Sequence, residues 1–246
     1  MRLRNDDPVA IALVQAIRSG DVEGLNRLLG DHPGLATARI VDRKGSRTPL
    51  HVAADWPGYF PNGAKVVRAL IQAGADPDAP GEGGPPPQET PLHWAASSDD
   101  LEVAEALIDG GADIEAPGGS IAGTPLSNAV GYGCWQVARR LVDRGAKVEE
   151  LWHAAALGMM PQLEEFFAAT PGPGPKEIND AFWQACHGGQ PRAAAYLLSR
   201  GADPNWVPDY AKEPPLATAG GLSTRWDILV SWLREHGAKA GDPAVK

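Results

Sequence analysis

Apolar residues recur along the chain at the three- and four-residue spacing of an amphipathic helix. The clearest stripes are Val66, Val67, Leu70 and Ile71, then Val103, Ala104, Leu107 and Ile108, with fainter copies at Phe166 and Phe167, Leu197 and Leu198, and Leu229, Trp232 and Leu233. One helix cannot bury such a stripe alone, so we expect helices that stack on their neighbours along the chain.

A short motif comes before these stripes and predicts a second kind of helix. Thr-Pro-Leu-His-x-Ala begins at Thr48 and again at Thr90, and Thr-Pro-Leu-Ser-Asn-Ala begins at Thr124. Weaker copies begin at Leu13, Leu151, Phe182 and Pro215. Thr caps a helix and Pro fits its first turn, so the Thr-Pro pairs at 48, 90 and 124 predict helix starts.

A second motif follows most stripes and predicts where the helices end. It begins at Gly74, Gly111, Gly145, Gly201 and Gly237, each followed by Ala and then Asp or Lys. Gly adopts the left-handed conformation that ends a helix because it has no Cβ. The two motifs stay in phase, which indicates one repeated helix–turn–helix unit.

These motifs resemble those of the ankyrin-repeat family, whose period is about 33 residues. The resemblance implies an all-α ankyrin-repeat solenoid of about seven helix–turn–helix units, with projecting loops and a concave groove. We place the units at about 8–40, 46–80, 88–116, 122–148, 149–178, 179–206 and 213–240. We expect a single domain over residues 1–241 and a short flexible tail over 242–246.

The repeat spacing departs from the family period in two places. Thr90 follows Thr48 by 42 positions, and the excess lies in residues 56–63, between two helices, and 81–87, in a projecting loop. Conversely, Leu151 follows Leu126 by only 25 positions, so the loop between those units is cut short. We expect an irregular stack near its middle.

Composition excludes several classes of function. The 246 residues carry a formal net charge of −9, without a Lys/Arg-rich run, which argues against a nucleic-acid partner. The start of the chain lacks the pattern of a signal peptide, and no apolar run is long enough to span a membrane. We expect a soluble, cytoplasmic protein, monomeric as repeat stacks with polar ends commonly are.

Cysteine and motif chemistry point away from metals and cofactors. Cys134 and Cys186 are the only cysteines, and the register places them two units apart, too far for a disulfide. We therefore predict free thiols. His and Cys lack metal-ligand spacing, and no Gly-rich stretch lies in a phosphate-binding context, so we expect no metal and no cofactor.

The resemblance assigns structural roles to the histidines of the motif. His51 and His93 match the family histidine that ties one unit's helix to the adjoining loop by hydrogen bonds. Trp152 and Trp183 stand at that position in later units. We expect them to be packing substitutes whose indole N–H needs a partner.

In the family, the position after this histidine and those three and four residues further on face the concave groove. Here they gather aromatic side chains among Asn, Gln and His, a composition typical of recognition surfaces. The predicted binding residues, with two from an overhanging loop, are Asp55, Trp56, Trp94, Asn128, Tyr132, His153, Gln184, His187, Trp206 and Tyr210.

Two functions remain open for this groove. In the first, the protein is a non-catalytic module that holds a protein or peptide, and its acidic charge favours a basic partner. In the second, it binds a small molecule or is an enzyme, with a pocket centred on Trp94, Asn128, Tyr132, His153, Gln184 and His187. His153 or His187 would then be the general base, with Asp55 to orient it.

Overall fold

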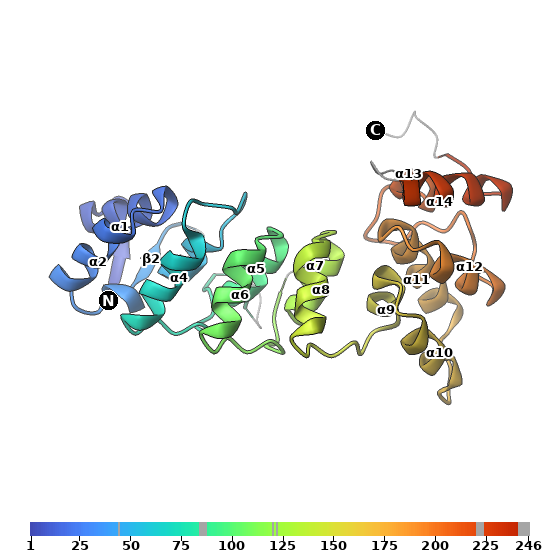
Figure 1. Ribbon diagram of the computed structural model, residues 1–246, viewed down its shortest axis with the longest axis horizontal. Helices are drawn as coiled ribbons and strands as arrows, with labels where there is room; N and C mark the ends of the chain where they lie inside the picture. The colour runs from blue at the N-terminus through green and yellow to red at the C-terminus, as the bar shows by residue number, and fades with distance from the viewer. Residues whose placement is uncertain (44, 84–87, 120, 122, 220–223, 241–246) are drawn as a thin grey trace. The chain divides into compact units, whose positions relative to one another are not determined.

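The computed structural model describes residues 1–43, 45–83, 88–119, 121, 123–219 and 224–240 (Figure 1). The chain divides into two compact units, Met1–Ala146 and Lys147–Lys246, and each is described by itself.

Unit 1 is built from successive helix pairs. Its helices are α1 (Pro8–Ser19), α2 (Val22–Asp31), the 3-10 helix η1 (Leu35–Thr37), α3 (Pro49–Ala53), α4 (Gly63–Gln72), α5 (Pro91–Ser97), α6 (Leu101–Asp109), α7 (Pro125–Gly131) and α8 (Trp135–Asp143). The second helices of the pairs, α4, α6 and α8, pack in succession, and so do the first helices, α3, α5 and α7 (Figure 1). The apolar stripes of α4 and α6 are therefore buried by the next pair in the unit.

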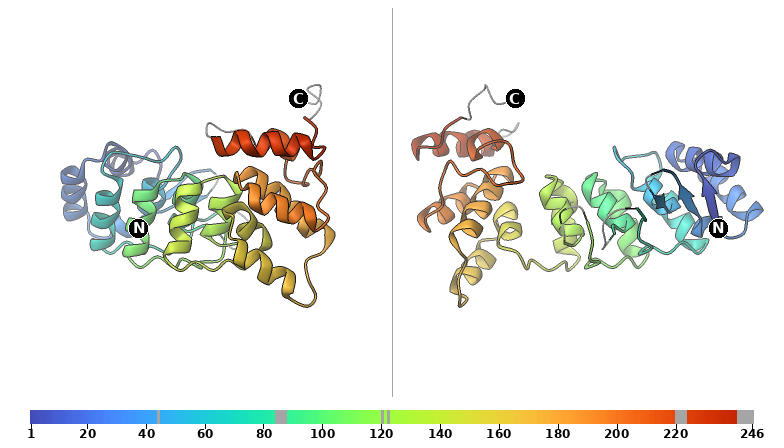
Figure 2. Two further views of the ribbon diagram at one scale, coloured as in Figure 1. Left: turned by 45° about the vertical axis from the view of Figure 1, so that its right-hand side comes forward. Right: turned by 180° about the vertical axis from the view of Figure 1, so that it is seen from behind.

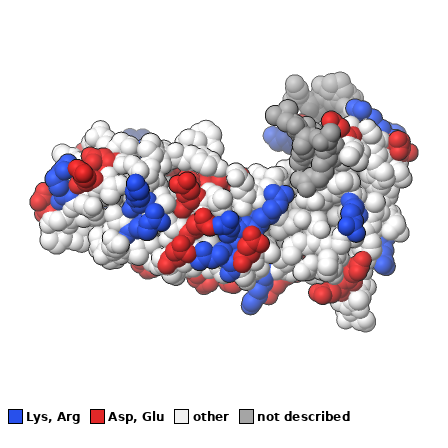
Figure 3. Space-filling view, viewed as in Figure 1, with Lys and Arg blue, Asp and Glu red and all other residues white. Residues whose placement is uncertain are grey.

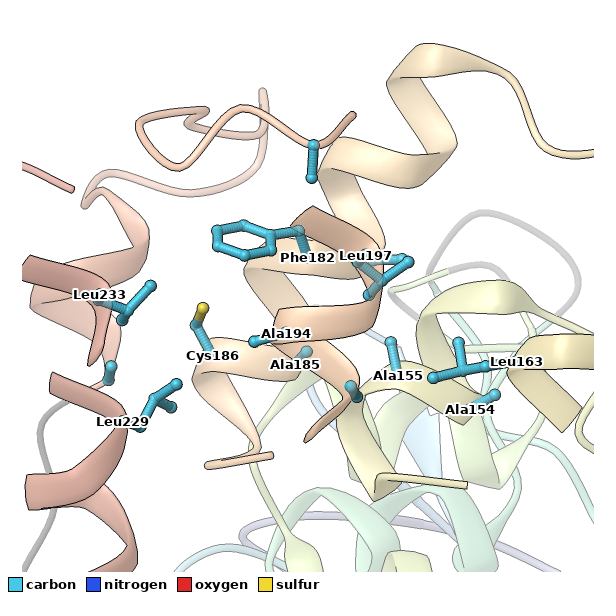
Figure 4. Packing of buried hydrophobic residues seen from close by; sticks show 14 of the residues in the cluster. Ala154, Ala155, Leu163, Phe182, Ala185, Cys186, Ala194, Leu197, Leu229 and Leu233 are labelled. Atoms are coloured by element: carbon cyan, nitrogen blue, oxygen red, sulfur yellow. The ribbon is translucent and has the colours of Figure 1, made fainter. Parts of the chain in front are cut away.

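Unit 2 continues the alternation of first and second helices. It contains α9 (Leu151–Leu157), α10 (Met160–Ala168), α11 (Pro175–His187), α12 (Pro191–Ser199), α13 (Pro215–Thr218) and α14 (Thr224–Glu235). Its core gathers Phe182, Cys186, Leu197, Leu229 and Leu233, which Figure 4 shows between α11, α12 and α14. Small residues such as Ala154 and Ala185 allow the helices to approach closely in the same core.

The predicted helix starts are confirmed at the Thr-Pro motifs. Thr48, Thr90 and Thr124 are the N-cap residues of α3, α5 and α7, with Pro in the first turn. The Nδ1 atom of His51 accepts from the backbone N–H of Thr48 at 3.3 Å, and Ser127 Oγ accepts from Thr124 N at the same distance. Ser127 therefore supplies in the third motif the acceptor that His supplies in the first.

The predicted helix ends are confirmed at the Gly-Ala motifs. Gly74, Gly111, Gly145, Gly201 and Gly237 all have positive φ, between 86° and 99°. The Ala after each glycine donates its N–H to a Leu carbonyl five residues earlier, as Ala112 does to Leu107 at 3.0 Å. This bond satisfies a carbonyl that the end of the helix would otherwise leave without a partner.

A small sheet stands at the N-terminal end of unit 1, and the sequence motifs did not predict it (Figure 2). Its strands are β1 (Arg2–Arg4), β2 (Arg39–Val41) and β3 (Ser46–Arg47) in the order β1-β2-β3. β1 runs parallel to β2, with Leu3 opposite Ile40, and β3 runs antiparallel to β2. The strands are too short to carry a readable period-two pattern.

The fold class, an all-α repeat solenoid, is confirmed. The extent of a single domain over 1–241 stays a prediction, and the tail predicted over 242–246 lies outside the described residues. So does part of the lengthened loop 81–87. Both cysteines are buried free thiols, and burial raises the pKa of Cys134 to about 11. In the described part of the chain, no helix combines the length and apolar character needed to cross a membrane.

Candidate functional site

The predicted binding residues fall into two groups, one in each unit. Unit 1 carries Asp55, Trp56, Trp94, Asn128 and Tyr132. Unit 2 carries His153, Gln184, His187, Trp206 and Tyr210. The two groups are therefore described separately, each within its own unit.

Exposed aromatic side chains stand on the turns between the helices of unit 1. Trp56 is 77% exposed and Tyr59 60%, both in the turn between α3 and α4, and Tyr132 at the end of α7 is 55% exposed. We name these three residues the aromatic turn surface. Trp56 and Tyr132 were predicted from the sequence. Tyr59 was not, because the lengthened turn has no counterpart in the repeat register.

Hydrogen bonds fix the lengthened turn to the two following helix pairs. The backbone N–H of Tyr59 donates to Asp100 Oδ2 at 2.6 Å, and its hydroxyl donates to the carbonyl of Asp99 at 2.5 Å. Gln136 Nε2, on α8, donates to the same hydroxyl at 3.5 Å. Gly58 lies against Ser98, where an added Cβ would stand 3.2 Å from the serine Cβ.

Asp99 joins the second turn to the third. Its Oδ1 atom accepts from the backbone N–H groups of Gln136 and Val137, at 3.1 and 3.0 Å. These N–H groups belong to the first turn of α8, where the negative carboxylate also interacts favourably with the positive end of the helix dipole. The three consecutive turns are therefore one connected polar structure that carries the aromatic turn surface.

Asp55 lies beside this surface and is held in ion pairs. Its Oδ2 atom lies 2.7 Å from Arg18 Nη2 and 3.1 Å from Arg47 Nη1. The guanidinium of Arg18 also stands 5.7 Å from the centroid of the Phe60 ring. Asp55 thus links α1, the segment before α3, and the lengthened turn within unit 1.

Trp94 and Asn128 are less exposed than the aromatic turn surface. Trp94 is half-buried, with its ring edge-to-face against His51 at 4.9 Å. Asn128 is fully buried, and its Nδ2 donates to Glu89 Oε1 at 2.9 Å and to Ser97 Oγ at 3.1 Å. These contacts connect α7 to α5 and to the loop before α5, so the amide donor is engaged inside the unit.

His51 has the structural role that the family resemblance implied. Its Nδ1 accepts from Thr48, so Nε2 carries the proton and donates to the carbonyl of Glu89, 3.1 Å away in the loop before the next pair. Burial lowers the pKa of His51 to about 4, partly opposed by the Glu89 carbonyl. The residue is therefore neutral near pH 7 and ties one pair to the next.

Burial also lowers the pKa values of His153 and His187 in unit 2. His153 is 3% exposed, and burial lowers its pKa to about 4; its ring lies 4.0 Å from that of Trp152. Burial lowers the pKa of His187 as well. A general base works best with a pKa near the operating pH, so His153 is poorly matched to that task.

Aromatic and polar side chains meet on α11. The Trp183 ring stands 5.8 Å from that of Tyr210 at 89°, and 5.1 Å from that of His187. Gln184 Nε2 donates to the Tyr210 hydroxyl at 3.4 Å. We name Trp183, Gln184, His187 and Tyr210 the α11 cluster. The sequence had placed three of them in a groove and had given Trp183 only a packing role.

The packing role of Trp183 is confirmed. The side chain is buried, and its Nε1 donates to the carbonyl of Glu213 at 2.9 Å. That bond matches the one from His51 to Glu89, since both join a first helix to the following loop. Trp206, on the same loop as Tyr210, donates its Nε1 to Asp180 Oδ1 at 2.9 Å.

Positive and negative side chains are mixed on the face of unit 1 formed by α4, α6 and α8 (Figure 3). Arg140 pairs with Glu105, and Arg144 with Asp109 at 2.7 Å, so the charges link α8 to α6. Among the described residues, no group of three or more His, Cys, Asp or Glu is placed to hold a metal ion.

Paired helices that end in left-handed glycines, and that are joined through a buried histidine, define an all-α repeat fold. Residues 62–150 match the family model described as ankyrin repeats (3 copies). Residues 62–150 are therefore ankyrin repeats. The search of curated proteins found no match to the sequence.

Proposed function

We propose that unit 1 binds a protein or peptide partner, with the aromatic turn surface at the centre of the contact. Ankyrin repeats are generally protein–protein interaction modules. The observation that carries the proposal is the exposure of Trp56, Tyr59 and Tyr132 on turns that are tied together by hydrogen bonds.

The energetics of recognition favour this surface. Trp and Tyr are enriched among the residues that dominate protein interfaces, because they bury a large area with few rotatable bonds. A surface already fixed by the contacts of Tyr59 and Asp99 loses little further entropy when a partner binds. The acidic chain, with its formal net charge of −9, favours a partner that carries basic residues near the contact.

The alternative of an enzyme finds less support. His153 is a weak base because burial lowers its pKa to about 4, and Asp55 is engaged by two arginines in unit 1. We therefore propose recognition without catalysis.

The proposal is tested by crosslinking followed by affinity measurement. A photo-reactive amino acid placed at position 56 should capture a partner in cells, while the same group at Ile11, also exposed in unit 1, should not. With the captured partner purified, Trp56→Ala and Tyr132→Ala should each weaken binding by about 30-fold, near 2 kcal/mol. Ile11→Ala should leave the affinity unchanged. A Trp56→Ala/Tyr132→Ala double variant with full affinity would exclude this surface.

A further inference from the structure

One face of α11 is covered by the loop that leads from α12 to α13. Residues Asn179, Asp180, Trp183, Gln184 and His187 share this face, as their spacing on a helix requires. The loop is attached at the start of the face by Asp203 N, which donates to Asn179 Oδ1 at 2.8 Å. The bonds of Trp206 and Trp183 fasten it further along.

Gln184 has an unmet hydrogen-bonding group under this loop. The residue is 3% exposed, and its described partner is the Tyr210 hydroxyl, which accepts from Nε2 at 3.4 Å. Its Oε1 atom is buried without a hydrogen-bond partner among the described residues. Such a deficit costs about 1–3 kcal/mol.

The surroundings of this amide are suited to a positive charge. Trp183 and Tyr210 present aromatic rings, which attract cations over their faces. Asp180 on α11 and Asp209 in the loop both attract Lys176, whose Nζ stands 2.7 Å from Asp180 and 3.7 Å from Asp209. The Asp180 hydrogen bond raises the pKa of Lys176, with Asp209 and Tyr210 contributing.

We propose that Trp183, Gln184 and Tyr210 form a binding site for a cationic nitrogen group, such as the guanidinium of an arginine side chain. The N–H groups of the ligand supply the donor that Gln184 Oε1 needs, and the exposed ring of Tyr210, which packs edge-to-face with Trp183, lies beside the charge. An anion would instead face the carboxylates of Asp180 and Asp209. The site lies wholly in unit 2 and does not depend on the aromatic turn surface.

The ligand class is tested by titrating the full chain with two matched compounds. N-acetyl-arginine amide should shift the indole N–H resonance of Trp183 in NMR spectra. N-acetyl-citrulline amide, which has nearly the same shape without the charge, should bind at least tenfold more weakly. A Gly-Arg-Gly peptide distinguishes the sources: tighter binding than the single residue indicates a site for protein segments, and equal binding a site for a free small cation. Equal binding of the citrulline compound, or no shift with any arginine compound, overturns the proposal.

Two variants separate ligand binding from a purely structural role. Gln184→Leu removes the unmet amide and replaces it with an apolar group of similar size, so the thermal midpoint should stay equal or rise while arginine binding is lost. Tyr210→Leu should weaken binding at least fivefold without unfolding the protein, because Tyr210 is 61% exposed. Ile228→Ala, at a similarly exposed position of unit 2 on α14, is the control and should bind as the unaltered protein does. A Gln184→Leu protein with a lowered midpoint and unchanged binding contradicts the site.

Discussion

His51 shows how a single side chain can join neighbouring repeats. Its ring accepts from Thr48 at the start of its own helix and donates to Glu89 in the next loop. Protonation would place a hydrogen on Nδ1, the atom that the Thr48 N–H already faces. The cost of a buried charge and the loss of this acceptor both oppose the charged form.

Because the fold disfavours protonated His51, the free energy of unfolding should fall in mild acid. The unfolded chain takes up a proton on His51 near pH 6.5, but the folded chain does so only near the lowered pKa of about 4. Between these values the unfolded state binds more protons, so the free energy of unfolding decreases as the pH falls, by about 3 kcal/mol for this residue. Urea denaturation at pH 7.5 and pH 4 measures the change.

A variant isolates the contribution of His51. In His51→Gln the difference in unfolding free energy between the two pH values should be about 3 kcal/mol smaller than in the unaltered protein. His236→Gln, at an exposed position directly after the last helix, should leave that difference unchanged. A His51→Gln protein with the full pH dependence would show that other groups cause it.

Some residue roles were predictable from the sequence and others were not. His51 and Trp183 occupy fixed positions in a repeated motif, so their contacts follow from the register. Asn128 occupies the next position of the same motif, yet it is fully buried. The residues that engage it, Glu89 and Ser97, come from other elements, and no local pattern reveals that they converge on it.

At the scale of elements, the ends of the second helices depend on backbone conformation. Gly111 has a φ of 96°, and nothing lies within 4 Å of the place where a Cβ would stand. Any penalty for a side chain at this position therefore comes from the left-handed backbone and not from a clash.

A matched pair of substitutions tests this explanation. Gly111→Ala should destabilise the protein by about 1 kcal/mol. Gly30→Ala, inside α2 with equally open space and no positive φ, should stabilise it by about 0.5–1 kcal/mol. Chemical denaturation measures both values. Changes of the same sign at the two glycines would contradict the assignment to backbone conformation.

The elements that the sequence did not reveal are those without a repeated pattern. The strands β1, β2 and β3 contain two or three residues each, too few to show alternation. The lengthened turn was recognised from the 42-residue spacing, but the spacing does not show where Tyr59 lies. That position depends on Asp99 and Asp100, about 40 residues further on.

At the scale of the molecule, the boundary between the two units lies in the stretch from Leu126 to Leu151, where the spacing between repeats is shortened. The boundary falls between Ala146 and Lys147, one residue after the helix-ending Gly145. The predicted groove residues therefore separate into two sets. The repeat register could not show this, because it treats every junction between pairs as equivalent.

Because unit 1 has its own buried core, residues 1–146 should fold when expressed alone. We expect a single cooperative thermal transition by circular dichroism, because α4, α6 and α8 pack in succession within the unit and Leu70 and Leu107 are buried. A shorter fragment ending at residue 109 would lose α7 and α8, expose the α6 stripe, and melt at a lower temperature. A non-cooperative transition for residues 1–146 would show that unit 1 needs unit 2.

The attachment of Tyr59 also has an evolutionary and engineering consequence. Shortening this turn to the common ankyrin length would remove the Tyr59 backbone N–H that donates a hydrogen bond to Asp100. Asp100, now 2% exposed, would then be open to solvent. A substitution at Gln136 would in turn affect Tyr59, 77 residues earlier in the chain, because Gln136 Nε2 donates to the Tyr59 hydroxyl. Insertions and substitutions in these three turns should therefore be tolerated as a set and not one at a time.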